Sequence, residues 1–356
     1  MRTLSFPLPR EAGREHNDMT RIEIPIPFPI KSVNIYLIED SAPTLIDAGF
    51  HSEEGLEMLK NALREKGLRI SDIRRVLLTH GHIDHVGLAG RIQEASGAEI
   101  FIHPRDREKC IWDIDTYAEK KKAPFLRFFE ESGLPEAVVE TIAEEMDDRF
   151  RSYFPGDFDV KELREETPFL FDDFTLEVIP CPGHTRGSVC FLDRENRRFF
   201  SGDHLLEKIT SNPVVELETR ENGTGFKSLS HYLESLNCTQ RLDIESVLPG
   251  HGRPFREHQR RITEIKRHHE IRRDQILKLL RSRSAPPNGL SLFAITMSVF
   301  PELKAWDVFL GMSETVGHLE ILEQKGSVVS RFEGRQRIYR PKTASSVEKE
   351  AACPTR

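Results

Sequence analysis

The feature that most constrains this chain is a short apolar run that ends directly in a histidine-rich loop. Residues 75–79, Arg-Val-Leu-Leu-Thr, have the length and character of a buried strand. The loop that follows, His80-Gly81-His82-Ile83-Asp84-His85, places three histidines and one aspartate within six residues. A helix cannot align residues two apart, whereas a loop at a strand end can turn His80 and His82 into one cleft. The sequence therefore predicts a strand whose end carries a candidate metal site.

Strand-like and helix-like segments alternate on both sides of this loop. Leucines recur close to helical spacing over residues 56–68, which predicts an amphipathic helix, and residues 226–236 predict another. The segments with strand character are 22–28, 33–38, 44–46, 98–102, four short runs between 168 and 203, and 246–248. Such alternation is typical of an α/β architecture built in layers.

Two changes in the character of the chain predict its domains. Residues 105–165 are strongly charged and contain aromatic pairs, so we expect a helical insertion over the site. Beyond Pro254, a basic helix candidate is followed by helical segments and a β-like hairpin, which is the pattern of a winged helix. The predicted units are a disordered extension at 1–18, a catalytic domain at 19–254, a basic helix with a small winged-helix-like α+β domain at 255–343, and a disordered tail at 344–356.

The composition excludes several classes of protein. With 356 residues, 38% of them hydrophobic and 31% charged, the chain can form one large core and a smaller one. It contains no apolar run of the length that crosses a bilayer, so we expect no membrane partner. Five cysteines without a CxxC pair do not describe a disulfide framework, which favours a cytoplasmic protein. The net charge of -7 disfavours a molecule that binds polyanions over its whole surface.

Three further polar loops follow strand-like segments and contain metal-ligand residue types. They are the loops at 181–188 with His184, at 201–204 with Asp203, and at 249–252 with His251. Neutral imidazoles and carboxylates are the usual ligands of zinc and similar metals. Two ligand sets that share a carboxylate can hold two ions about 3.5–4 Å apart, and a water between them then becomes hydroxide near neutral pH. The four loops predict activated-water chemistry without a serine or cysteine nucleophile.

These motifs together resemble the metallo-β-lactamase-fold superfamily. The resemblance rests on residues 79–85, 182–185, 202–203 and 249–252, and it covers roughly residues 22–254. It implies a four-layer αββα sandwich. It also implies two sets of metal ligands, the first being His80, His82 and His184 and the second Asp84, His85 and His251, with Asp203 bridging both. Asp84 is in addition the candidate catalytic residue, and Asp47 is expected to orient a ligand without binding the metal.

Two departures from related patterns narrow the expected activity. Asp203 stands where binuclear β-lactamases commonly have cysteine, so we do not expect antibiotic hydrolysis. His82 stands where the flavin-linked diiron proteins typically have glutamate, and no flavodoxin domain is visible, which disfavours reduction of oxygen or nitric oxide. The persulfide dioxygenases keep much of the same histidine pattern and stay open as an alternative.

We expect a metal-dependent hydrolase in which a hydroxide between two metal ions attacks an ester, thioester or related small acyl substrate, as in the glyoxalase II branch. The C-terminal pattern resembles the β-lactamase-like protein 2 group, some of whose members act on single-stranded RNA, so endoribonuclease or phosphodiesterase activity is the alternative. Further alternatives are a mononuclear iron thiol or persulfide dioxygenase and a nucleic-acid-binding regulator. The expected cofactors are two divalent transition metal ions, zinc first, with iron or manganese as alternatives. A homodimer is a further hypothesis.

Other polar residues are given plainer interpretations. We expect a structural role for His204, because neighbouring residues on a strand point to opposite faces, and packing for Cys181. His268 and His269 are expected on a solvated helix face, as are most of the nearby basic side chains. Arg186 and Lys208 are candidates for binding an anionic group of the substrate.

Overall fold

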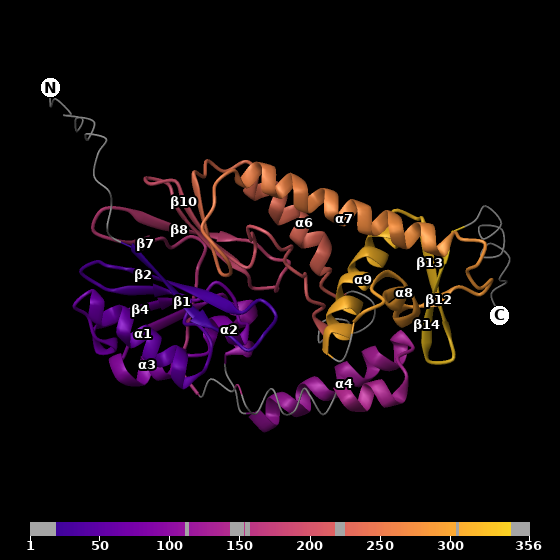
Figure 1. Ribbon diagram of the computed structural model, residues 1–356, viewed down its shortest axis with the longest axis horizontal. Helices are drawn as coiled ribbons and strands as arrows, with labels where there is room; N and C mark the ends of the chain where they lie inside the picture. The colour runs from indigo at the N-terminus through magenta and orange to yellow at the C-terminus, as the bar shows by residue number, and fades with distance from the viewer. Residues whose placement is uncertain are drawn as a thin grey trace.

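Two mixed sheets lie face to face in the computed structural model, which describes residues 19–110, 114–142, 153, 157–217, 225–303 and 306–342 (Figure 1). The first sheet has the order β1-β2-β3-β4-β5-β6. Its strands are β1 (Met19–Pro25), β2 (Ser32–Ile38), β3 (Thr44–Ile46), β4 (Arg75–Leu77), β5 (Glu99–Ile102) and β6 (Lys161–Glu162). β1 to β3 pair antiparallel, whereas β3 to β6 pair parallel. The predicted extension at 1–18 and the tail at 344–356 lie outside the described residues.

The second sheet has the order β11-β10-β9-β8-β7. Its strands are β7 (Phe169–Leu170), β8 (Thr175–Pro180), β9 (Val189–Asp193), β10 (Arg198–Gly202) and β11 (Ser246–Pro249). The pairs are antiparallel except for β10 with β11, which run parallel. Apolar side chains from both sheets, such as Tyr36, Leu77, Phe191 and Phe200, form one buried cluster between them.

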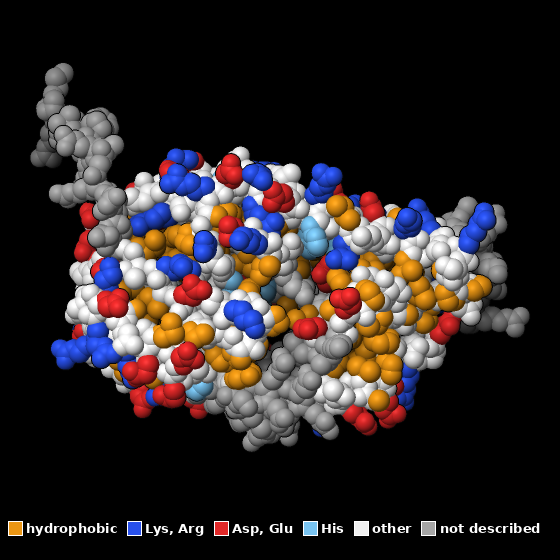
Figure 2. All heavy atoms as spheres, in the orientation of Figure 1, with side chains coloured by type: hydrophobic (Ala, Val, Ile, Leu, Met, Phe, Trp, Pro, Cys, Tyr) orange, Lys and Arg blue, Asp and Glu red, His pale blue; other side chains and the backbone are white. Residues whose placement is uncertain are grey.

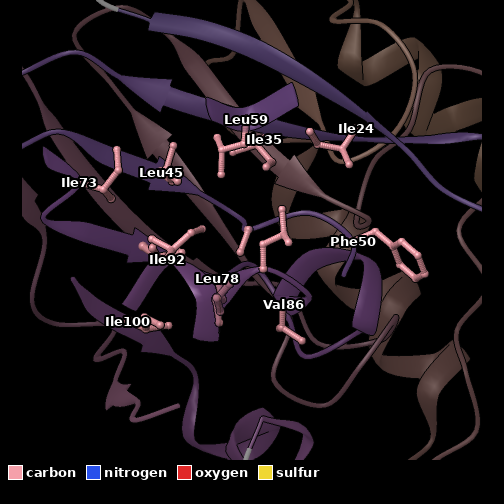
Figure 3. Packing of buried hydrophobic residues seen from close by; sticks show 14 of the residues in the cluster. Ile24, Ile35, Leu45, Phe50, Leu59, Ile73, Leu78, Val86, Ile92 and Ile100 are labelled. Atoms are coloured by element: carbon pink, nitrogen blue, oxygen red, sulfur yellow. The ribbon is translucent and has the colours of Figure 1, made fainter. Parts of the chain in front are cut away.

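Helices cover the outer face of each sheet. On the first sheet lie α1 (Glu53–Glu65), the short α2 (Ile83–Val86) and α3 (Ala89–Ser96), whose apolar residues pack on the strands as Figure 3 shows. α1 begins at Ser52, whose hydroxyl accepts a hydrogen bond from the Gly55 N–H at 3.0 Å. On the second sheet lie α6 (Ser228–Thr239) and part of α7 (His258–Leu280). The order helix, sheet, sheet, helix confirms the predicted αββα sandwich.

The remaining elements gather beside the sandwich around a separate core. α8 (Leu292–Val299), α9 (Trp306–Gln324) and the end of α7 pack with a three-stranded sheet formed by β12 (Leu290–Ser291), β13 (Val328–Glu333) and β14 (Gln336–Pro341). The predicted order of helices followed by a hairpin is present, and its winged-helix-like character stays a prediction. Among the described residues, no helix is long and apolar enough to cross a membrane.

The charged segment at 105–165 links the two cores. It starts with the 3-10 helix η2 (Pro104–Lys109) and continues in α4 (Ile114–Ser132), which lies below α8 and α9 in Figure 1. Phe128 and Phe129 of α4 pack into the C-terminal core with Phe309 of α9. The segment therefore joins the C-terminal helices through its apolar side, while η2 stays beside the sheet edge.

One expectation about α7 is wrong. His269 was expected on a solvated face. The residue is instead only 2% exposed, and its ring lies against Tyr232 of α6 and His318 of α9. The neighbouring His268 has a side chain that is 44% exposed and fits the expectation. The charge-rich sequence of α7 does not distinguish the two histidines, because His269 is covered by residues of two other helices, α6 and α9.

Candidate metal centre

The polar loops predicted from the sequence meet at one edge of the sandwich. β3 ends before Asp47, β4 ends just before the 80–85 loop, and β10 and β11 end before Asp203 and His251. Because β3 runs parallel to β4 and β10 runs parallel to β11, the carboxyl ends of each pair lie at the same edge. Figure 2 shows this face hollowed between the sandwich and the C-terminal helices, with histidine side chains visible in the hollow.

The first ligand set forms a tight cluster of imidazoles. His80, His82 and His184 each offer a ring nitrogen, and these atoms all lie within 4.8 Å of one another. The His82 Nδ1 atom is 3.1 Å from His80 Nε2 and 2.9 Å from His184 Nε2. Burial, together with the neighbouring His184, lowers the pKa of His82 to about 3. Burial also lowers the pKa of His80 and of His184. The three imidazoles are therefore neutral at ordinary pH and present the lone pairs that a metal ion requires.

The second ligand set combines one carboxylate with two imidazoles. Ligand atoms of Asp84, His85 and His251 also lie within 4.8 Å of one another, and His251 Nε2 is 3.3 Å from Asp84 Oδ2. Burial opposes charge on His251, but the carboxylate of Asp203 outweighs it and raises the pKa to about 10. Without a metal ion, this half of the site therefore attracts protons to balance its carboxylates.

Asp203 stands between the two sets. Its Oδ1 atom lies 3.4 Å from the Nε2 atoms of both His85 and His251, whereas its Oδ2 atom lies 3.4 Å from His184 Nε2. Among the described residues, the buried His85 Nε2 and Asp203 Oδ1 atoms have no hydrogen-bond partner. Buried polar atoms are normally satisfied, so this pair fits a site built for cations. The residues present thus suit two metal ions, with one carboxylate oxygen facing each set.

The outward nitrogens of the histidines are held by groups behind them. Asp47 Oδ2 lies 2.7 Å from His85 Nδ1, and Asp47 Oδ1 accepts the Thr79 N–H at 2.8 Å. His251 Nδ1 donates to the Ser32 carbonyl at 2.6 Å. A proton held on Nδ1 leaves the Nε2 lone pair facing the metal position. Asp47 therefore occupies the orienting place expected for it.

The sequence that forms this site matches a model of a known protein family. Residues 29–251 match the model described as the metallo-beta-lactamase superfamily. The chain belongs to the metallo-beta-lactamase superfamily. The expectation of a hydrolase of this superfamily is confirmed by curated relatives that are named as hydrolases. The matched range contains all seven ligand positions predicted above.

Two relatives and one solved structure are similar to this chain over half of its length or more. The probable metallo-hydrolase YqjP of Bacillus subtilis is 29% identical over 317 residues, 89% of this chain and 96% of that protein. The hydroxyacylglutathione hydrolase GloC of Haemophilus influenzae is 29% identical over 188 residues, 52% of this chain and 72% of that protein. The metallo-beta-lactamase family protein TTHA1429 of Thermus thermophilus has a TM-score of 0.76 and 27% identity, covering 91% of this chain and 99% of that one. The similarity to YqjP and TTHA1429 thus extends beyond the matched superfamily domain.

One functional residue of this superfamily member was not found from the sequence. The fully buried Asp106 of η2 accepts the Gly81 N–H at 2.9 Å and the Thr185 hydroxyl at 2.6 Å. It also accepts the Gly187 N–H at 3.1 Å and pairs with Lys109 at 3.0 Å. This carboxylate therefore clamps the two loops that carry the first ligand set. No local pattern marks it, because Asp106 is one of many charges in its segment.

The two candidates for anion binding lie at different places. Lys208 lines a surface cleft of about 440 Å³ beside Gly252, together with Arg21, Arg253 and two glutamates. Arg186 follows His184 in its loop, and its backbone N–H is 3.3 Å from a carboxylate oxygen of Glu216. Only Lys208 thus lines this cleft, and binding of an anionic substrate group by either residue stays a prediction.

His204 turns away from the metal centre, as expected. It is 2% exposed, its Nε2 atom is 2.9 Å from the Thr239 hydroxyl, and its carbonyl accepts the Tyr232 hydroxyl at 3.0 Å. We expect His204→Ala to lower the free energy of unfolding by about 1–3 kcal/mol, because the buried Thr239 hydroxyl loses its hydrogen bond to the imidazole and keeps the one that it donates to the Ser235 carbonyl. Denaturant unfolding and elemental analysis test this, and a folded variant that has lost a metal ion would contradict it.

Proposed function

We propose that this chain uses a metal-activated water to hydrolyse an ester, thioester or related acyl substrate. The observation that carries the proposal is Asp203, which directs one carboxylate oxygen toward each of two ligand sets. When bound, two divalent ions would lower the pKa of a water between them and polarise the substrate carbonyl. Zinc as the metal and a cytoplasmic location belong to the same proposal.

The residues of the chain contribute orientation and charge. Asp47 keeps a proton on His85 Nδ1, so that the opposite nitrogen faces the site. Asp84 is held in the second set beside His251, and His85 and His251 outweigh its burial and lower its pKa to about 2. It is therefore a carboxylate over the working range of pH. An anionic Asp84 can hold a metal ion and accept a hydrogen bond from an attacking water.

Two further observations favour an acyl substrate over RNA. The name of the relative GloC describes hydrolysis of an acylglutathione, and its region of similarity spans 72% of that protein. On α7, the exposed Arg260 pairs with Glu257 and Glu264, which reduces the positive charge available for phosphates. RNA cleavage is nevertheless the second candidate, because a two-metal site suits attack at phosphorus as well as attack at a carbonyl.

The test begins with metal content. After expression in metal-replete medium, we expect about two transition metal ions per chain, as a shared carboxylate between two sets requires. Fewer than one ion per chain would contradict the binuclear site. The purified protein is then assayed on an acyl thioester and on labelled single-stranded RNA, with Asp203→Ala as the inactive control.

The outcomes separate the candidate functions. Hydrolysis of the thioester that is lost in Asp203→Ala, without RNA cleavage, is expected. RNA cleavage without thioesterase activity would favour a phosphodiesterase. Bound iron with oxygen consumption in the presence of thiols would indicate a dioxygenase, and a metal-bearing protein inactive on every substrate would favour the regulator hypothesis.

A further inference from the structure

A single segment connects the metal centre to the C-terminal helices. Residues 204–217, here called the strap, follow directly after Asp203 and run toward α9. The Val215 N–H donates to the Ser313 hydroxyl of α9 at 2.7 Å. The Asn212 side-chain amide donates to the Leu310 carbonyl of α9 at 3.1 Å. Two positions of the strap, three residues apart, are therefore bound to two residues that lie three apart on one helix.

Two other helices hold the same segment. Arg261 of α7 donates from its guanidinium to the carbonyls of Leu206 and Ile209, both at 2.8 Å. Ser228 of α6 donates to the Val214 carbonyl at 2.7 Å. A segment bound to three helices by hydrogen bonds along its length has little freedom to move on its own.

The other side of the strap touches a predicted ligand. His184 Nδ1 lies 2.8 Å from the Asn212 carbonyl and 2.9 Å from the Ser211 hydroxyl. A proton on Nδ1 shared with these oxygens leaves the Nε2 lone pair for the metal position. The outward nitrogens of His85 and His251 are held instead by Asp47 and Ser32, both within the sandwich.

A second connection reinforces the first. Glu216 of the strap pairs with Lys109 at 2.7 Å, and Lys109 pairs with Asp106, which clamps the loops of the first ligand set. Both connections lead to the His80, His82 and His184 cluster. These hydrogen bonds and ion pairs therefore connect the C-terminal helices to the first ligand set. None of them reaches Asp84, His85 or His251.

We propose that α9, acting through the strap, positions His184 and so sets the metal affinity of the first ligand set. Ser313 and Asn212 are positioning residues in this scheme. The C-terminal helices thus contribute to metal binding. A displacement of α9 lowers the metal affinity of the first ligand set more than that of the second. The inference rests on the metal centre proposed above.

The test compares two substitutions with a matched control. Ser313→Ala removes the acceptor for the Val215 N–H, and Asn212→Ala removes the side-chain tie while keeping the carbonyl on His184. Ser298→Ala is the control, because the Ser298 hydroxyl is exposed and donates within α8, to the Ala294 carbonyl, with no other partner among the described residues. Metal-free full-length proteins are titrated with Co²⁺, and the two binding steps are followed by visible absorption. Circular dichroism checks that each variant is folded.

We expect the dissociation constant of one binding step to rise about 10-fold or more in both strap variants, in the range found when a group behind a metal ligand is removed. The other step is expected to change less than twofold, and the control not at all. Equal weakening of both steps, or no weakening in folded Asn212→Ala, would overturn the proposal. A wild-type protein that binds no Co²⁺ would instead overturn the metal centre itself, so the two failures are distinguishable.

Discussion

Replacing Asp84 with alanine is expected to reduce kcat/KM on the acyl substrate by at least about 100-fold. This loss exceeds the usual effect of removing a residue that only hydrogen-bonds to a metal ligand. Asp84 supplies the only carboxylate that belongs to the second set alone, and its Oδ2 atom is 3.3 Å from His251 Nε2. Without it, the second metal position keeps two imidazoles and a share of Asp203. The charge that holds the second ion falls, and the activated water loses its partner.

The same substitution is expected to leave the fold intact. Asp84 lies at the start of the short α2 at the edge of the sheet, and the apolar core does not depend on it. Activity with a saturating metal supply and denaturant unfolding of the metal-free protein measure the two effects separately. Asp159→Ala, which changes an exposed aspartate of the same charge, serves as the control. Unaltered activity in folded Asp84→Ala would contradict the role of Asp84.

Asp106→Ala is expected to cost about 3–5 kcal/mol of the free energy of unfolding, the range for breaking a buried ion pair. The substitution leaves the Lys109 ammonium buried with one partner fewer, and it frees the N–H groups of Gly81 and Gly187. Since these groups belong to the loops of the first ligand set, metal binding should weaken as well. Asp106→Asn keeps the size of the side chain and separates the loss of charge from the loss of shape.

The pH dependence of stability gives an independent check on Asp106. Burial opposes its ionisation, but Lys109 and the surrounding donors prevail and lower its pKa to about 2. A carboxylate with a depressed pKa stabilises the fold above its unfolded value, about 3.9, and this contribution is lost as the pH falls toward 2. The difference in stability between wild type and Asp106→Asn should therefore be constant above about pH 5 and shrink at lower pH. A difference that grows on acidification would show that Asp106 is not held ionised.

Much of the site was readable from the sequence because its ligands are local features of strand ends. Residues 75–79 form a strand that runs into the 80–85 loop, and the geometry of parallel pairs brings the remaining loops to the same edge. The structure brings together all seven residues that were predicted as metal ligands. The α/β class follows in the same way, since alternating strand-like and helix-like segments are local patterns. The αββα order of the layers was implied by the resemblance to the superfamily.

The residues that hold these ligands in place could not be predicted from local sequence patterns. Asp106 meets Thr185 across 79 positions of the chain, and Val215 meets Ser313 across 98. In the sequence, Asp106 is one charge among many, and Ser313 is an ordinary helical serine. Their roles arise only when separate elements pack, as does the burial of His269 between α6 and α9.

By itself, then, the sequence determined the α/β class of the fold and the residue types at the 80–85 loop and its three partner loops. Only the tertiary structure decided which atom each ligand presents and which groups orient it. It also decided that the C-terminal helices reach His184 through the strap. The physical reason is that hydrophobic periodicity and turn residues act over a few neighbours, whereas the direction of a side chain depends on whatever long-range packing places behind it.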